Sequence, residues 1–197
     1  NYPDPGSADD FPFVSWLTRS VDWISFHPQD YRQTQSDILL TYSLSTLPPP
    51  KWKQFWSLKI LPEARTIWFR FIYNKLHCNA SISRFDPTVP TTCSLCHDPL
   101  EDINHLLIHC PFKWSAWHGV LSRFAPYLEF HPEDVESILR NLSRFDFVDN
   151  TRLLRICSHA LLYIWRAHWR YVFDGTPFLP QQIVSTTFDK LRHHSLH

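Results

Sequence analysis

The sequence of 197 residues contains no methionine, only three glycines and no net charge. So few glycines disfavour phosphate-cradling loops and tight β-hairpins, which depend on glycine's backbone freedom, and no dinucleotide-binding or Walker pattern is present. Because methionine is missing even at position 1, we expect a piece of a longer protein or a processed chain. The polar, acidic start of the chain does not resemble a signal peptide, and no apolar run approaches the length of a membrane span.

Apolar and aromatic residues are abundant, and the charges are unevenly distributed. Hydrophobic residues make up 44% of the chain and aromatic residues 16%, which is enough for a substantial core. Residues 51–84 carry seven basic side chains and one acidic, residues 85–110 carry four acidic and none basic, and residues 151–197 carry six basic and two acidic. The zero net charge argues against a general nucleic-acid binder, and charge runs of this size usually mark solvated helix faces. If the two basic segments share a surface, they would form a patch that contacts phosphate groups.

One short stretch carries four potential zinc ligands in the pattern Cys-x2-Cys-x8-His-x4-Cys. They are Cys93, Cys96, His105 and Cys110. A structural zinc ion takes four Cys or His ligands in a tetrahedron, and a Cys-x-x-Cys turn places two thiolates on one side of a tight loop. A histidine on the next helix and a cysteine near its end can complete the site. The spacing therefore predicts one structural Zn²⁺ in a reducing compartment.

The identity of the fourth ligand is open from the sequence. His109 lies four residues after His105, so both project from one helical face and a Cys2His2 site is possible. The spacing favours Cys110, because Pro111 ends the helix and the last turn can bend inward there; His97, directly after Cys96, would be strained as a ligand. A Cys93–Cys96 disulfide is the redox alternative, although a Pro/Thr loop rather than a strand precedes it.

The apolar spacing predicts helices and no strand of useful length. Pro48, Pro49 and Pro50 predict a polyproline-type linker. Helices are expected near 11–26, 36–47, 62–77, 101–110, 112–126, 132–142, 150–173 and 180–194. The fold class is therefore mostly α, an irregular helical domain with one small zinc knuckle made of a loop and a short helix. We expect an N-terminal helical lead-in over 1–50, a zinc-binding region over 51–118 and a C-terminal helical region over 119–197 that packs on it.

The run from residue 52 to residue 117 shows several features in a fixed order. A Trp-rich helix comes first, in FWSLKILPEARTIWFRFIYNKL, and the Cys-x2-Cys pair follows. Glu101 then stands four residues before the His105-Leu106-Leu107 step, and Cys110-Pro111 and Trp117 complete the run. This order resembles the zinc-binding region downstream of the polymerase in non-LTR (LINE-type) retrotransposon reverse transcriptases. The later segment ALLYIWRAHWRYVFDGTPF resembles the Trp-rich helix that commonly follows that region, whereas residues 1–50 show no clear match.

The resemblance implies a non-catalytic C-terminal module whose four ligands hold the metal. It also implies that the module helps to engage element RNA or target DNA, that the upstream polymerase domain of the same polyprotein is a partner, and that the protein works in a nuclear or cytoplasmic ribonucleoprotein inside the cell. From charge alone we select five candidate phosphate contacts, Lys51, Lys53, Lys59, Arg65 and Arg70.

Two other classes of function compete with this one. The aromatic content and zero net charge also fit a protein-interaction or scaffold domain that docks onto the polymerase or another partner. An enzyme is disfavoured, because a catalytic zinc keeps one position open for water and four protein ligands leave none. Cys78 and Cys157 read as packing residues rather than nucleophiles.

Overall fold

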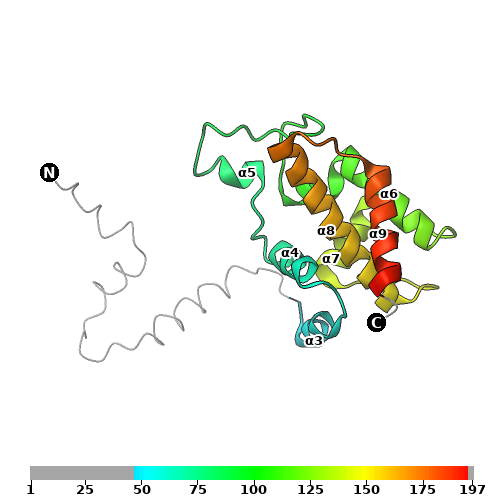
Figure 1. The fold of residues 1–197 in the computed structure, drawn as a ribbon. Coiled ribbons are helices and arrows are strands. Elements are labelled where there is room, and N and C mark those ends of the chain that lie inside the picture. Colours follow the sequence, from blue (N-terminus) through cyan, green and yellow to red (C-terminus); the bar gives the residue numbers. More distant parts are fainter. Residues whose placement is uncertain (1–46, 195–197) are drawn as a thin grey trace, which may run out of the picture. The chain divides into compact units, whose positions relative to one another are not determined.

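A computed structural model describes residues 47–194, with side chains up to residue 192, and over this range the protein is helical without a strand (Figure 1). The elements are α3 (Pro49–Ser57), α4 (Pro62–Ile72), α5 (Asn79–Ile82), the π-helix η2 (His105–His109), α6 (Pro111–Phe124), α7 (Pro132–Asn141), α8 (Asn150–Asp174) and α9 (Pro180–His194). The predicted fold class is confirmed. The helices predicted near 11–26 and 36–47 lie outside the described residues.

Helix α8 is the central element, and it packs against α4, α6 and α9. Asp149 begins it as an N-cap whose carboxylate accepts the backbone N–H groups of Thr151 and Arg152. Gly175 ends it at φ 64°, a left-handed conformation that glycine adopts without a Cβ clash. Between these caps the apolar residues of its first half are almost all buried. The neighbouring helices therefore pack around α8.

Helices α6 and α9 approach each other closely because of one small residue. A Cβ placed on Gly119 would stand 2.8 Å from Cγ2 of Val184, closer than carbon atoms can pack. Gly119 therefore allows α9 to lie flat on α6, and α9 covers α8 from the same side.

The sequence predictions missed the short helix α5 and gave an ordinary helix near 101–110, where the structure has the π-helix η2. Two further segments also differ. The triple proline does not form a polyproline linker, since Pro49 and Pro50 occupy the first turn of α3, where the missing N–H groups cost nothing. Helix α4 ends at Ile72 rather than near residue 77. Asn74 adopts φ 52°, and the N–H of Lys75 bonds to the carbonyl of Arg70 at 2.7 Å, so a left-handed cap stops the helix.

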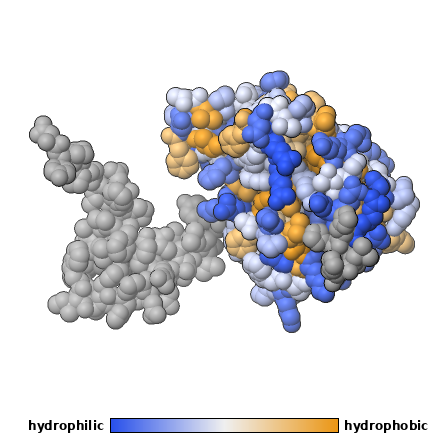
Figure 2. Space-filling model, viewed as in Figure 1, coloured by the Kyte–Doolittle hydropathy of each residue, from blue (hydrophilic) through white to orange (hydrophobic). Residues whose placement is uncertain are grey.

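The core is a single cluster of apolar side chains that runs through all the longer helices. Trp68 of α4 is fully buried, and its indole N–H donates to the carbonyl of Leu139 of α7 at 2.6 Å. The predicted boundary at residue 118 falls inside α6, so the two ranges on either side of it share this core. On the face in Figure 2, hydrophobic residues gather in small areas between hydrophilic ones. No described helix is both long and apolar enough to cross a membrane.

Candidate metal centre

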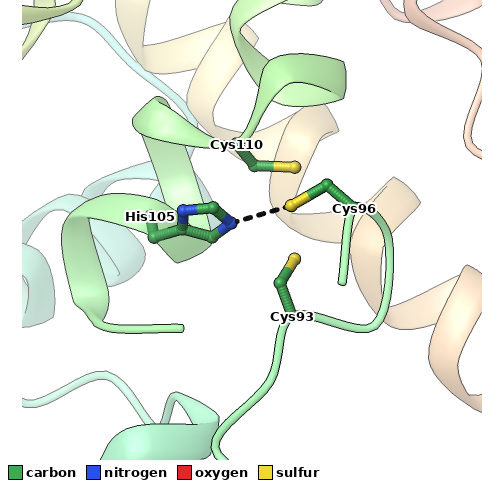
Figure 3. Close-up of side chains that lie close together, drawn as sticks. All are labelled: Cys93, Cys96, His105 and Cys110. Carbon is green, nitrogen blue, oxygen red and sulfur yellow. Dashed lines mark hydrogen bonds between the residues drawn. The ribbon is translucent and has the colours of Figure 1, made fainter. Parts of the chain in front are cut away.

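The four side chains selected by spacing converge on one point, as Figure 3 shows. The three sulfur atoms and one imidazole nitrogen of Cys93, Cys96, His105 and Cys110 all lie within 4.8 Å of one another. Nε2 of His105 stands 3.2 Å from Sγ of Cys96. A zinc ion with sulfur ligands at about 2.3 Å would hold them roughly 3.8 Å apart in a tetrahedron. Three thiols and one imidazole are the donor set of a closed Cys3His site, so the residues present fit zinc.

A tight turn positions the first two cysteines. The N–H of His97 bonds to the carbonyl of Cys93 at 2.9 Å, and the N–H of Cys93 bonds to the carbonyl of Asp98 at 2.8 Å. His97 closes this turn at φ 61°, a conformation that favours glycine. The backbone N–H groups of Cys96 and Leu95 point at Sγ of Cys93, and each such bond favours the thiolate over the thiol.

The π-helix η2 decides which later residues join the cluster. His105 and Cys110 are five residues apart, and an α-helix would direct them about 140° away from each other. The wider turn of a π-helix bonds residue i to i+5 and brings these positions toward one face. His105 stands at the first position of η2, Cys110 follows its last, and both reach the cluster.

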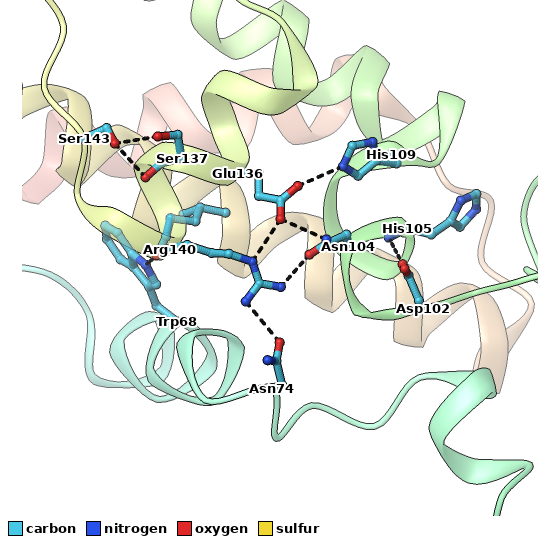
Figure 4. Close-up of polar contacts among 11 residues, drawn as sticks. Trp68, Asn74, Asp102, Asn104, His105, His109, Glu136, Ser137, Arg140 and Ser143 are labelled. Atoms are coloured by element: carbon cyan, nitrogen blue, oxygen red, sulfur yellow. Dashed lines mark hydrogen bonds and ion pairs between the residues drawn. The ribbon is translucent and has the colours of Figure 1, made fainter. Parts of the chain in front are cut away.

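His109 points away from the cluster and toward α7 (Figure 4). Its Nε2 lies 3.3 Å from Oε2 of Glu136, and Oε1 of Glu136 accepts from Nδ2 of Asn104 at 2.9 Å. Arg140 lies one turn further along α7; its guanidinium donates to Glu136 at 3.0 Å, to Asn104 at 2.6 Å and to Asn74 at 3.0 Å. This network fixes the orientation of η2 against α7, and the geometry favours Cys110 over His109 as the fourth donor.

Cys110 links η2 to the next helix. It is the N-cap of α6, with Pro111 in the first turn, and the N–H of Lys113 points back at its sulfur. The start of a helix favours negative charge, so it suits a thiolate there. Trp117, one turn further on, is fully buried, and its indole N–H donates to the carbonyl of Leu107 in η2 at 2.8 Å. The tryptophan thereby holds the π-helix in place from α6.

Without a metal ion the two most buried thiols of the cluster, those of Cys93 and Cys110, share a proton. A hydrogen bond from Cys110 lowers the pKa of Cys93 to about 3, because it stabilises the thiolate. The same bond raises the pKa of Cys110, which holds the shared proton. Burial raises the pKa of Cys96. Metal binding would displace the remaining thiol protons, so affinity for the ion should fall as the solution becomes acidic.

A buried ion pair lies behind the cluster, and spacing did not reveal it. The side chain of Lys113 is fully buried, with Nζ 3.8 Å from Oε2 of Glu101. Neither atom has a hydrogen-bond partner among the described residues. Burial lowers the pKa of Lys113 and raises that of Glu101 to about 7. Lys113 therefore places a positive group near the thiols, as its electrostatic effect on both Cys93 and Cys110 shows.

The five basic residues selected from charge divide into two groups. Nζ of Lys51 donates to the carbonyl of Leu142 at 2.7 Å, and Arg65 donates to the carbonyls that end α3, including that of Phe55 at 2.7 Å. These two side chains therefore stabilise the fold by hydrogen-bonding to backbone carbonyls. The other three, Lys53, Lys59 and Arg70, are exposed and free to reach a ligand.

The comparison with protein families agrees with this site. Residues 37–117 match the family described as zinc-binding in reverse transcriptase. The resemblance to the zinc-binding region of reverse transcriptases is thereby confirmed, and within that range the chain holds a possible zinc site of three cysteines and one histidine. No curated protein and no solved structure matches the chain significantly.

Proposed function

We propose that this chain is a non-catalytic accessory module of a LINE-type reverse transcriptase, in which one structural Zn²⁺ holds the knuckle and the neighbouring helices engage element RNA or target DNA. The observation that carries the proposal is the convergence of four donor atoms inside a segment that matches the zinc-binding family. The upstream polymerase of the same polyprotein is the expected partner, and a nuclear or cytoplasmic ribonucleoprotein is the expected setting.

The metal's role follows from where its ligands sit in the chain. Cys93 and Cys96 come from a loop, whereas His105 begins η2 and Cys110 lies between η2 and α6. A bound Zn²⁺ would supply four strong bonds that tie the loop to the helical body. Three thiolates and one neutral imidazole around Zn²⁺ carry one net negative charge, and the buried ammonium of Lys113 is placed to offset it.

The nucleic-acid contact is assigned to what we term the α3–α4 face: Lys53, Trp56, Lys59, Phe69 and Arg70. The rings of Trp56 and Phe69 lie 5.9 Å apart, and their side chains are 55% and 36% exposed. Lys53 precedes Trp56 by one helical turn, and Arg70 follows Phe69 directly, so cations flank the rings. Exposed aromatic rings beside basic side chains suit unpaired bases and their phosphates.

Metal content tests the first half of the proposal. Purified wild type should carry about one zinc ion per chain, and Cys93→Ser and His105→Ala should each lose it, as measured by elemental analysis after dialysis. Ser122→Ala, at a partly exposed position of α6 outside the cluster, is the control and should keep the metal. A wild type without zinc, or variants that keep it, would overturn the metal assignment.

Salt-dependent RNA binding tests the second half. Replacing Lys53, Lys59 and Arg70 together by Gln should weaken binding of single-stranded RNA and reduce the slope of log K against log salt by roughly 2, since each lost phosphate contact contributes about 0.7. The matched control replaces three exposed arginines outside the face, Arg84, Arg144 and Arg170, by Gln. Equal slopes in the two triple variants would remove the α3–α4 face from the proposal.

A scaffold role is the second candidate, and the exposed rings of Trp56 and Phe69 favour it as well. Aromatic side chains are enriched at protein interfaces, and the net charge of zero suits a protein partner. If RNA is not retained even at low salt while the polymerase domain binds the chain and Trp56→Ala weakens that binding, the scaffold role replaces the nucleic-acid role.

A further inference from the structure

A cavity of about 520 Å³ opens between the first turns of α8 and the end of α9, and none of its described lining residues belongs to the metal centre or to the α3–α4 face. Three arginines line it, Arg152, Arg155 and Arg192, together with Asp149. Ile156 and Leu191 supply apolar wall. Its volume lies within the range of pockets that hold small molecules. The sequence did not select this place, because its basic residues come from two helices and meet only in the fold.

The positive charge in this cavity is poorly compensated. Arg192 pairs with Asp189 on its own helix. The carboxylate of Asp149 is engaged as the N-cap of α8 and accepts backbone N–H groups there. Arg152 and Arg155 have no carboxylate partner among the described residues, and Nε of Arg155 is buried without a hydrogen-bond partner in that same range. Like charges held together in this way repel each other, so an anion would relieve the repulsion.

The apolar side of the cavity is held in shape by a fourth arginine. The guanidinium of Arg123, from α6, lies 4.5 Å from the ring centre of Phe188, which lines the cavity. The guanidinium of Arg152 lies 5.7 Å from the ring of Phe124. These contacts keep both arginines extended rather than folded onto the surface. Each of the two helices therefore contributes both cationic and apolar side chains to the cavity.

We propose that this cavity binds a nucleotide unit, with its phosphate on Arg152 and Arg155 and its sugar or base against Ile156 and Leu191. Arginine forks match phosphate oxygens in pairs, and these two arginines stand one turn apart in the first turns of the 25-residue helix α8. A purely polar anion would leave the apolar wall unused, and an apolar ligand would leave the guanidinium groups uncompensated. A nucleotide provides a phosphate for the guanidinium groups and a sugar or base for the apolar wall.

The test is a titration of the zinc-loaded chain with adenosine monophosphate, adenosine and inorganic phosphate, followed by calorimetry. The monophosphate should bind more tightly than either fragment, and Arg152→Gln with Arg155→Gln should weaken it by at least about tenfold. Arg170→Gln, exposed on the same helix and about 27 Å away, makes a like change of charge and should leave the affinity within about twofold. Circular dichroism melts check that each variant is folded.

Three results would overturn the proposal: no saturable binding of the monophosphate, equal binding of adenosine, or equal loss in Arg170→Gln. A short single-stranded oligonucleotide then identifies the source of the nucleotide. Displacement of the monophosphate by the oligonucleotide assigns the cavity to a strand, and simultaneous binding of both assigns it to a free nucleotide. The triple variant of the α3–α4 face should leave monophosphate binding unchanged, so this proposal and the proposed function can fail separately.

Discussion

The knuckle loop, residues 79–100, and the helical body, formed by α4 and α6 to α9, are built on different principles. Between residues 79 and 100, Cys93 is the only buried residue, whereas the body is organised around fully buried side chains such as Trp68, Trp117 and Leu161. Burial of apolar surface stabilises the body. The loop buries little apolar surface, with Ala80 and Leu95 only partly covered by the core, and its conformation depends mainly on backbone hydrogen bonds, the thiol–imidazole cluster and the metal that fits it.

Removal of one metal ligand should produce the largest difference in stability between the knuckle loop and the helical body. Cys110→Ser should weaken zinc binding by more than about a hundredfold, since even changes next to a ligand reach that size. Competition with a chromophoric chelator measures the affinity. Hydrogen exchange should then show the knuckle loop unprotected while α8 keeps its protection.

The matched variant for that experiment is His109→Ala. His109 is paired with Glu136 and turned away from the cluster, so its loss should cost about 1 kcal/mol of stability or less and leave one zinc bound. The opposite pattern, with zinc kept in Cys110→Ser and lost in His109→Ala, would mean that the Cys2His2 alternative is correct.

The helical body should instead be destabilised by changes in its core. Trp68→Ala should lower the free energy of unfolding by about 3–5 kcal/mol, because it leaves a cavity and an unpaired carbonyl at Leu139. Denaturant unfolding at constant excess zinc measures the change, and the zinc content of the remaining folded protein should be normal. Trp56→Ala, at a ring that is 55% exposed, should cost about 1 kcal/mol or less. Equal costs at the two positions would contradict the burial argument.

The parts of the fold that sequence predicted are those with a local signal. The long helix of residues 150–174 has an Asp N-cap, apolar periodicity and a Gly stop, and its limits agree with the prediction. The cluster was also predictable, because Cys-x-x-Cys and a following His and Cys have few other uses. Helix α4 was predicted too long, since the asparagine at position 74 stops it in a left-handed cap that the apolar stripe conceals.

The parts that sequence missed depend on contacts between distant residues. No local signal marks η2 as a π-helix; its geometry is held by Trp117 from α6 and by Glu136 from α7 through Asn104. For this reason the choice between His109 and Cys110 could not be made by counting residues alone. The burial of Lys113 could not be predicted either. A lysine in an amphipathic helix normally faces solvent, and only the packing of the helices places it beside Glu101.

Acid should weaken the body through a buried histidine of α8. Burial lowers the pKa of His168 in the folded protein to about 3, against 6.5 for an ordinary histidine. Below pH 6.5 the unfolded chain binds a proton that the folded protein does not, so stability falls as the pH drops, by up to about 1.4 kcal/mol per pH unit. Between pH 6.5 and 5.5, His168→Leu should recover about 1 kcal/mol of this loss.

Chelated protein should be used for that comparison, because zinc affinity itself changes with pH. Urea unfolding at the two pH values gives the stabilities, and His118→Leu, at an exposed histidine of α6, is the control. Parallel losses of stability in wild type and His168→Leu would show that His168 does not take up its proton on unfolding.

The smallest expected effect concerns the left-handed backbone conformation, which one residue adopts in the knuckle loop and another in the body. His97 in the knuckle loop and Leu142 in the body adopt φ 61° and φ 47°, respectively. His97→Gly should relieve strain and stabilise the zinc-bound loop by roughly 0.5–1 kcal/mol, which raises zinc affinity two- to fivefold, because nothing at that exposed site depends on the side chain. His97→Ala keeps the Cβ and should show no gain. Leu142→Gly removes a fully buried side chain and should destabilise the body despite relieving the same strain. Gains at both positions would mean that backbone strain outweighs burial in the body too, and the contrast between loop and body would fail.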